Sequence, residues 1–296
     1  MKHIIYRYYK TYFKNGSLLF GLIIIILGVY LFAISVKNLD YSDFSSYMGQ
    51  VNLAYISTSF FVFLAFMIYM LSALKNSEQN ISEIKEGTIK FLLIKPLLRH
   101  EILLAKYIAN IFGTFSIFFI TSLSYTALCA LYIEDFDIAL GLYAIFFEML
   151  LIALVFIIFM QSFALALSLL IKKEALFMAF VVIILLAVFL FIPLFRVINE
   201  NGYLKYHLAI FDISYHFLYM AKTIFAIPLD TNLNLVSMIS GLYNYGSIDP
   251  DFFNNFSSEF VETHYVSLWP TILSYLFLSI ALMGFALFRF KRIDIS

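Results

Sequence analysis

Side chains able to carry out catalysis are sparse in this sequence, and their spacing fits none of the common catalytic motifs. No Gly-Lys pair occurs, so the loop that holds nucleotide phosphates, G-x-x-x-x-G-K-[ST], is absent. The five histidines never stand as H-x-x-H or H-E-x-x-H, and no G-x-S-x-G nucleophile motif is present. We therefore expect a chain that is not an enzyme, with no cofactor-binding or metal-binding residues and no nucleic-acid partner.

Two polar residues, Glu148 and Gln161, stand inside apolar runs that are long enough to cross a membrane. A carboxylate at membrane depth often marks a substrate or ion pathway. Glu148 could instead extend to the nearby interface, or be neutral and hydrogen-bonded to another helix. For Gln161, a hydrogen bond between helices, worth about 0.6–2 kcal/mol, is the simpler explanation. Both residues are kept as possible polar members of a pathway.

The elements that hold these residues must be membrane helices, because the composition excludes an ordinary soluble protein. Of the 296 residues, 63% are hydrophobic and 13% are charged, and the mean hydropathy is +0.93. A soluble domain carries about twice that share of charge. The single cysteine, Cys129, excludes a disulfide within the chain, and we expect it to be a small buried residue.

Apolar runs predict six membrane-spanning helices, and thus an all-α membrane protein with a single transmembrane domain. A helix needs about 20 mostly apolar residues to cross the hydrocarbon layer. The six predicted spans are 17–36, 53–74, 101–133, 142–171, 175–195 and 267–290. The third and fourth exceed the minimum, so they must tilt or project from the lipid. The first run is too long for the core of a cleaved signal peptide, and we interpret it as a retained span.

The Lys and Arg residues predict that both termini lie on the cytoplasmic side of the plasma membrane. With a cytoplasmic N-terminus, 15 of the 19 basic residues fall inside. Cytoplasmic loops of membrane proteins carry such an excess. The four basic residues left outside are Lys37, Arg196, Lys205 and Lys222.

Residues 2–16, before the first span, show the spacing of an amphipathic helix. Its polar face holds His3, Arg7, Lys10, Thr11 and Lys14, and its apolar face holds Ile5, Tyr9, Tyr12 and Phe13. We expect this helix to lie in the membrane plane, with the aromatic face in the acyl boundary and the cations near anionic headgroups. A plain extension of the first span is the alternative.

The predicted cytoplasmic loop 75–100 is longer than a connection between two spans requires. Its first part, 76–86, is polar and helix-capable, and Gly87 interrupts it because glycine is a poor helix-interior residue. Thr88 can cap a second short helix, 89–95, which the following proline ends. Two short amphipathic segments at the cytoplasmic face predict a docking surface.

The predicted outer segment, 196–266, also contains more than a linker. Residues 211–227 are strongly apolar but include Asp212, His216 and Lys222. We therefore expect one or two short helices at the outer membrane boundary rather than a seventh crossing. Such helices would let Asp212 and Lys222 reach water.

Taken together, these features resemble the type-2 permease family of ATP-binding-cassette transporters. The architecture is similar over the whole chain: an elbow helix, six spans and both termini inside. The most specific likeness is E-G-T-I-K-F-L-L at 86–93, followed by K-P at 95–96 and R-H-E-I-L-L-A-K at 99–106. It is similar to the family's E-x-G-T-hydrophobic stretch, basic-Pro pair and R-x-E-hydrophobic run closed by Lys. One departure is that Glu stands directly before Gly-Thr.

The resemblance implies that the loop between the second and third spans carries a coupling helix, which docks on a separate ATPase subunit. It assigns to this interface Glu83, Glu86, Gly87, Thr88, Lys90 and Lys95. It also implies two ATPase subunits and a second permease, either a copy or a homologue. ATP hydrolysis is then expected in the partner.

The predicted function is the membrane-spanning subunit of an ATP-driven exporter that works by alternating access. Amphipathic peptides, lipids or drugs are the expected substrates, and small ions are an alternative within the same family. A second hypothesis is a membrane scaffold that transmits ATPase motion to an extracytoplasmic protein through 196–266. A third, an intramembrane enzyme, has no constellation of residues to support it.

Overall fold

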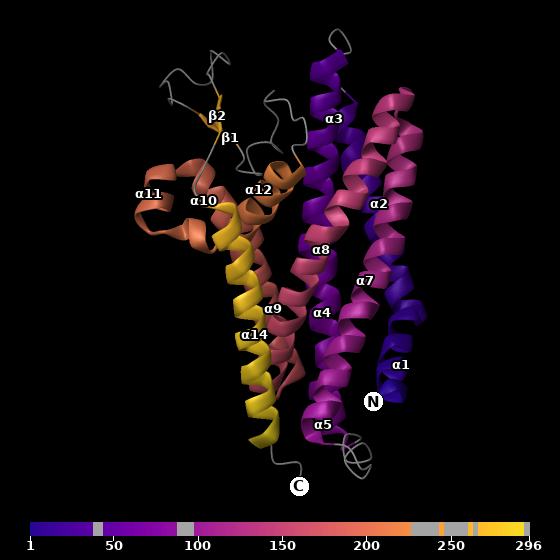
Figure 1. The fold of residues 1–296 in the computed structure, drawn as a ribbon, viewed down its shortest axis with the longest axis vertical. Coiled ribbons are helices and arrows are strands. Elements are labelled where there is room, and N and C mark those ends of the chain that lie inside the picture. Colours follow the sequence, from indigo (N-terminus) through magenta and orange to yellow (C-terminus); the bar gives the residue numbers. More distant parts are fainter. Residues whose placement is uncertain (38–43, 88–97, 226–242, 246–259, 263–265, 293–296) are drawn as a thin grey trace.

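The computed structural model describes residues 1–37, 44–87, 98–225, 243–245, 260–262 and 266–292. Within these residues, six helices are long and apolar enough to cross a membrane (Figure 1). They are Gly16–Val36, Tyr47–Lys85, Arg99–Tyr132, Phe136–Leu170, Glu174–Arg196 and Leu268–Arg292. The all-α architecture and the six candidate spans predicted from the sequence are therefore confirmed.

The helices of the first half are α1 (Lys2–Lys10), the 3-10 turn η1 (Thr11–Phe13), α2 (Asn15–Val36), α3 (Phe44–Thr58), η2 (Ser59–Ile68), α4 (Tyr69–Asn76), η3 (Ser77–Ser82), α5 (Glu83–Lys85) and α7 (Arg99–Tyr132). The second half has α8 (Phe136–Leu170), α9 (Glu174–Leu186), η4 (Ala187–Phe191), α10 (Ile192–Ile198), α11 (Glu200–Lys205), the 3-10 turn η5 (Leu208–Ile210), α12 (Ile213–Phe225) and α14 (Leu268–Arg292). Two short strands, β1 (Tyr243–Tyr245) and β2 (Phe260–Glu262), pair antiparallel.

The bundle has two distinct ends (Figure 1). The start of α1, the end of α5 and the end of α14 lie together, and we call this the inner end. The opposite end, where α3 begins, is the outer end. The positive-inside rule predicts that the inner end faces the cytoplasm.

The second long helix differs from the sequence prediction. We expected the second span to end near residue 74 and a separate short helix to follow. Instead α3, η2, α4, η3 and α5 follow one another without a break, and the candidate span Tyr47–Lys85 alone has 39 residues. At about 1.5 Å per residue it is far longer than the hydrocarbon layer, which is about 30 Å thick. The polar stretch after residue 75 stays helical because neighbouring helices provide its side chains with hydrogen-bond partners.

Three segments of the spans have π-helical hydrogen bonding: η2 and η3 in the second long helix, and η4 in the fifth. Such wide turns in helices are frequent at functional sites. In the fifth span the wide turn directly precedes Pro193, which lacks an amide donor and crowds the preceding turn. For η2 and η3 the sequence contains no comparable breaker.

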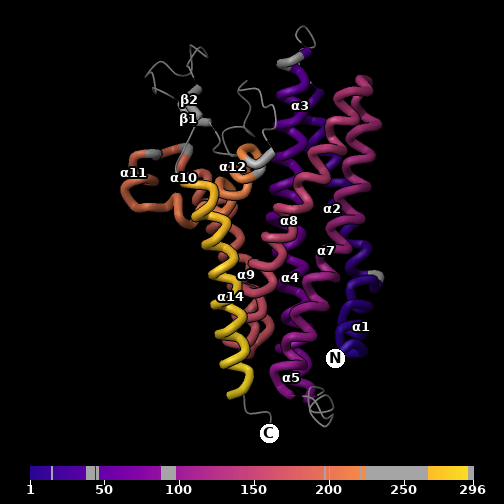
Figure 2. Tube along the Cα trace, viewed as in Figure 1, coloured from indigo at the N-terminus to yellow at the C-terminus, as the bar shows by residue number. Residues whose placement is uncertain are grey.

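The N-terminal helix α1 packs lengthwise on the inner part of α7, as the tube in Figure 2 shows. Its buried positions are Ile4 and Tyr8, which contact Ile102, Ala105 and Ala109. The turn η1 continues this stripe with Tyr12, which is fully buried. A helix forms where the sequence predicted one, but of the buried residues only Tyr12 was on the predicted apolar face, and Ile4 and Tyr8 were not.

Tyr12 approaches α7 at Gly113. A Cβ atom at position 113 would overlap the Tyr12 ring. Glycine is therefore required here for the close approach of η1 to α7, and not for backbone freedom.

The described part of the outer segment includes the end of α10, α11, η5 and α12, and the two paired strands β1 and β2. Helix α12 contacts α8 and α14 and lies beside the outer end of α14 in Figure 1. A short helix was predicted in this stretch, but the expectation that Asp212 reaches water is wrong. Asp212 is fully buried because it pairs with Arg196.

Candidate functional site at the inner end of the bundle

Polar side chains from four helices meet inside the inner end of the bundle. They are Tyr8 on α1, Asn76, Gln79, Asn80 and Glu83 on the second long helix, Lys106, Asn110 and Thr114 on α7, and Gln161 and Ser168 on α8. We call this set the inner polar cluster. The spacing is i, i+3, i+4, i+7 on the second helix and i, i+4, i+8 on α7, so each set occupies one helix face. These faces meet in the core.

An ion pair lies at the innermost part of this cluster. Lys106, whose side chain is fully buried, stands 2.9 Å from Glu83 Oε2. The Tyr8 hydroxyl donates a 2.8 Å hydrogen bond to the same oxygen, and the Lys106 ammonium also donates to the Gln79 carbonyl. Burial and the negative charge of Glu83 raise the pKa of Tyr8, so its hydroxyl stays protonated and remains a donor.

Closer to the membrane centre, neutral amides continue the cluster. Gln79 donates to Asn110 at 2.8 Å, and Asn76 donates to Gln161 at 2.8 Å. Gln161 in turn donates to the Thr114 hydroxyl at 2.7 Å. Five side chains therefore link three long helices without a charge.

The depth of the cluster follows from its neighbours. The Thr114 hydroxyl donates a 3.3 Å hydrogen bond to the Tyr12 hydroxyl. Helix α2 begins three residues after Tyr12, at Asn15. The apolar helix α2 is just long enough to cross the hydrocarbon layer. Thr114 and Gln161 thus lie near its inner border, whereas Glu83, Lys106 and Tyr8 lie beyond it.

The ion pair holds the helices together only while both of its charges are present. A buried charge costs several kcal/mol unless a partner of opposite sign and hydrogen bonds compensate it. Lys106 has Glu83, the Gln79 carbonyl and the face of the Tyr8 ring, 5.2 Å away. Displacing Glu83 would leave Lys106 uncompensated, so Glu83, α7 and α1 are held to each other.

The fifth span is attached at the same level. Ser77 and Ser82 donate long hydrogen bonds of 3.4 and 3.5 Å to the carboxylate of Glu174, the first residue of α9. The inner end of the second long helix therefore contacts α1, α7, α8 and α9.

The sequence matches one protein-family description, "ABC-2 family transporter protein", over residues 14–295. The chain belongs to the ABC-2 transporter family. No curated protein matches it. Proteins of this family are multi-pass membrane subunits that normally work with ATPase subunits in a membrane complex and generally have no enzymatic activity themselves.

In this ABC-2 protein, the residues predicted to dock an ATPase separate into three groups. Glu83 is largely buried in the ion pair with Lys106. Glu86 and Gly87 stand at the end of the helix, where Glu86 is exposed. Gly87 has a φ of 71°, the left-handed conformation that commonly ends helices at glycine. The others, Thr88, Lys90 and Lys95, lie outside the described residues.

The two candidate pathway residues are not brought together. Both lie on α8, 13 residues or about 20 Å apart along the helix axis. Gln161 is fully buried in the inner polar cluster, as the simpler explanation from sequence proposed. Glu148 is half-buried in the outer half of α8.

Sequence reasoning missed most of the inner polar cluster. Lys106 was noted as the end of a motif without a partner, and Asn76, Gln79 and Asn110 were not singled out. The signal was available in their spacing, because polar residues at i, i+3, i+4 and i+7 next to an apolar span indicate a buried polar stripe.

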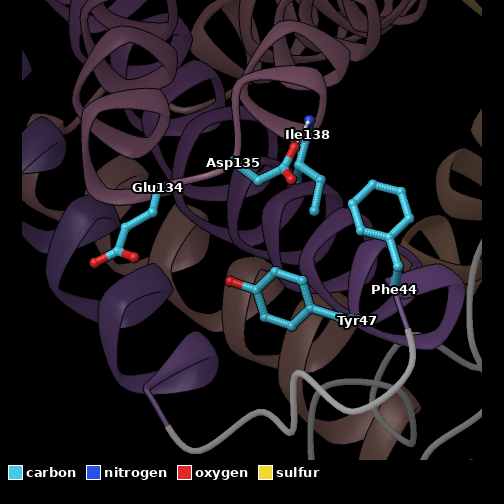
Figure 3. A pocket seen from close by; sticks show the side chains of 5 residues that line it. All are labelled: Phe44, Tyr47, Glu134, Asp135 and Ile138. Carbon is cyan, nitrogen blue, oxygen red and sulfur yellow. Dashed lines mark hydrogen bonds between the residues drawn. The ribbon is translucent and has the colours of Figure 1, made fainter.

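A cavity of about 290 Å³ opens at the outer end, between the start of α3 and the turn that joins α7 to α8. Phe44, Tyr47, Glu134, Asp135 and Ile138 line it (Figure 3). The Glu134 carboxylate points away from the two aromatic rings in Figure 3. Asp135 Oδ1 accepts the Asp137 and Ile138 amides and so caps α8. Helix capping therefore explains Asp135, and exposure to solvent explains Glu134.

Proposed function

We propose that this ABC-2 protein is the membrane-spanning permease subunit of an ATP-driven exporter. Two separate ATPase subunits bind at the inner end, and a second permease, a copy or a homologue, completes the pathway. Both termini face the cytoplasm of the cell. The proposed substrates are amphipathic peptides, lipids or drugs.

The observation that carries this proposal is how the loop between α5 and α7 is attached. At one end, Glu83 is bound to Lys106 and Tyr8. At the other end, the Leu98 amide donates to the Glu101 carboxylate at 3.0 Å, which caps the first turn of α7. A force applied to this loop would act directly on α1, α7 and the second long helix.

Glu83 takes a different part in this proposal from the one the sequence suggested. It acts as a positioning residue that anchors the loop from within. Docking of the ATPase is then assigned to the residues beyond it, beginning with Glu86 and Gly87 and including Thr88, Lys90 and Lys95.

Copurification tests the docking assignment. The tagged chain should bring down an ATPase from native membranes, and Glu86→Arg or Gly87→Pro should lose the ATPase or uncouple its activity from transport. Glu134→Arg, an equally exposed acid at the outer end, is the matched control and should retain it. If both inner variants transport normally, the docking assignment is wrong.

A scaffold that acts on an extracytoplasmic protein is the second candidate, because a buried ion pair between Arg196 and Asp212 holds the start of α12 to the end of the fifth span. Under this alternative, the tagged chain would copurify with an ATPase and an outer protein. Deleting the segment would abolish the action on that outer protein and would not alter substrate export. An ion exporter of the same family would instead show ATP-dependent ion flux in vesicles.

A further inference from the structure

A second buried cluster of titratable groups lies at the outer side, away from the inner polar cluster. Asp212 is paired with Arg196 and accepts a 3.1 Å hydrogen bond from the Tyr203 hydroxyl. Its other oxygen accepts the Tyr215 amide at 2.9 Å, so Asp212 also caps the start of α12. Arg196, from the end of the fifth span, thereby fixes where α12 begins.

One turn further, His216 joins α12 to the sixth span. Its Nε2 lies 2.6 Å from the Ala209 carbonyl, and its Nδ1 lies 2.8 Å from the Tyr275 hydroxyl on α14. A carbonyl oxygen can only accept, so Nε2 must carry the proton. When the ring is neutral, Nδ1 has a free lone pair, and the Tyr275 hydroxyl donates to it. The neutral form is the favoured one, because the side chain is almost fully buried.

A second ring proton would reverse the hydrogen bond between Nδ1 and Tyr275. If Nδ1 is protonated it becomes a donor, and the Tyr275 hydroxyl must turn its own proton away. The new positive charge would arise on a side chain that is 5% exposed. A buried charge without a dedicated counterion is costly, so protonation should weaken the contact between α12 and α14.

Among the residues that the structure describes, the other charged and titratable groups around His216 do not offer that counterion. Asp212 favours the protonated ring, but its charge is already shared with Arg196 and Tyr203. From α14 the facing titratable group is Tyr275. On α12 itself they are Tyr215, Tyr219 and Lys222, which are neutral or cationic.

Helix α12 also packs against α8, η2 and η4, and its hydrogen bond to Ala209 joins it to η5, which has no titratable residue. Neither η2 nor η4 contains a titratable residue. The ring contacts of α8 with this cluster come from Phe156 and Phe159, and its Glu148 lies about two turns further along the helix.

We propose that His216 makes the packing of α12 against the sixth span sensitive to protons on the outer side of the membrane. With the ring neutral, α12 is held between Ala209 and Tyr275. With the ring protonated, α12 separates from α14 while Asp212 still fixes its first turn to Arg196. The proposal concerns the chain alone and does not rest on the proposed partner or substrate.

The direction of the pH dependence follows from burial. Burial lowers the pKa of His216 below its ordinary value of about 6.5, and the charge of Asp212 opposes this only in part. The unpacked state therefore binds a proton that the packed state does not. The packing is fully stable above about pH 6.5 and loses stability as the pH falls below that value.

Hydrogen exchange of the purified full-length chain in lipid nanodiscs tests the proposal. After correction for intrinsic exchange rates, the protection of amides in 213–225 should fall about tenfold or more between pH 7.5 and pH 5. Protection of α7 should not change. In His216→Gln, the side-chain amide can still donate to Ala209 but cannot titrate, so protection should be independent of pH.

Two further variants distinguish a proton switch from general instability. Tyr275→Phe removes the partner of Nδ1 in either protonation state, so protection should be lower at every pH while its dependence on pH persists. His207→Asn replaces the exposed imidazole of the same segment by a residue that tolerates its φ of 53°, and should behave as wild type. The proposal is overturned if wild-type protection does not depend on pH, if the pH response persists in His216→Gln, or if His207→Asn abolishes it.

Discussion

The hydroxyl of Tyr8 donates a 2.8 Å hydrogen bond to the carboxylate of Glu83, 75 residues further along the chain. Tyr8 lies on the N-terminal helix, and Glu83 lies in the last turn of the long second helix, which ends at Lys85 before the proposed coupling loop. Lys106 on α7 completes the group through its ion pair with Glu83. The N-terminal helix is thereby tied to the loop, and we expect the two to move together.

Removing the cation from this group should be costly. Lys106→Met leaves the Glu83 charge largely buried without its partner, and we expect a loss of about 3–5 kcal/mol of stability. The double variant Lys106→Met/Glu83→Gln should lose less, because no unpaired charge remains. Lys173→Met, at an exposed position, is the control. Unfolding in mild detergent measures all three, and equal losses in the single and double variants would contradict the ion-pair argument.

The close approach of Tyr12 to α7 makes a second prediction. Gly113→Ala should displace the Tyr12 ring and loosen α1, lowering stability by about 1–3 kcal/mol. Gly141→Ala provides the matched control, since a Cβ there meets no atom within 4 Å and alanine favours a helix. Protease sensitivity of the first 14 residues and the melting temperature report the effect. A stable Gly113→Ala variant with protected termini would refute the close-packing interpretation.

Interrupting the neutral amide chain should also destabilise the inner end. Gln161→Leu removes one hydrogen bond from Asn76 and one from Thr114, and each lost bond costs about 0.5–1.5 kcal/mol. Asn76 keeps its bond to the Ser72 carbonyl, and Thr114 keeps its bond to Tyr12. Ser124→Ala is a suitable control, because that exposed hydroxyl bonds only the Ile120 carbonyl of its own helix. We expect melting temperatures to separate the two variants clearly, with Ser124→Ala close to wild type.

Cysteine labelling checks the orientation in the membrane. In a Cys129→Ser background, a cysteine at exposed position 86 should resist an impermeant reagent in intact cells, whereas one at exposed position 205 should react. A cysteine at position 80 would not report the orientation, because Asn80 is 1% exposed and a labelling reagent would not reach it from either side. Labelling at 86 from outside would reverse the predicted topology and, with it, the side on which an ATPase could bind.

The six spans and their order could be predicted from the sequence, because a membrane helix satisfies its own backbone hydrogen bonds and must present apolar side chains over its length. Runs such as 17–36 contain that information locally. The family resemblance rested on the order of these spans over the whole chain and, most specifically, on the short run of residues 86–106, which is also local information.

Tertiary structure alone decided which polar residues meet. Glu83 could be read as a surface docking residue, and Asp212 as an interfacial one, until Lys106 and Arg196 were placed against them. The same holds for α1, where α7 buries Ile4 and Tyr8. Each of these outcomes depends on how one helix is rotated against another far away in the chain, and such rotation is set by the packing of both surfaces together.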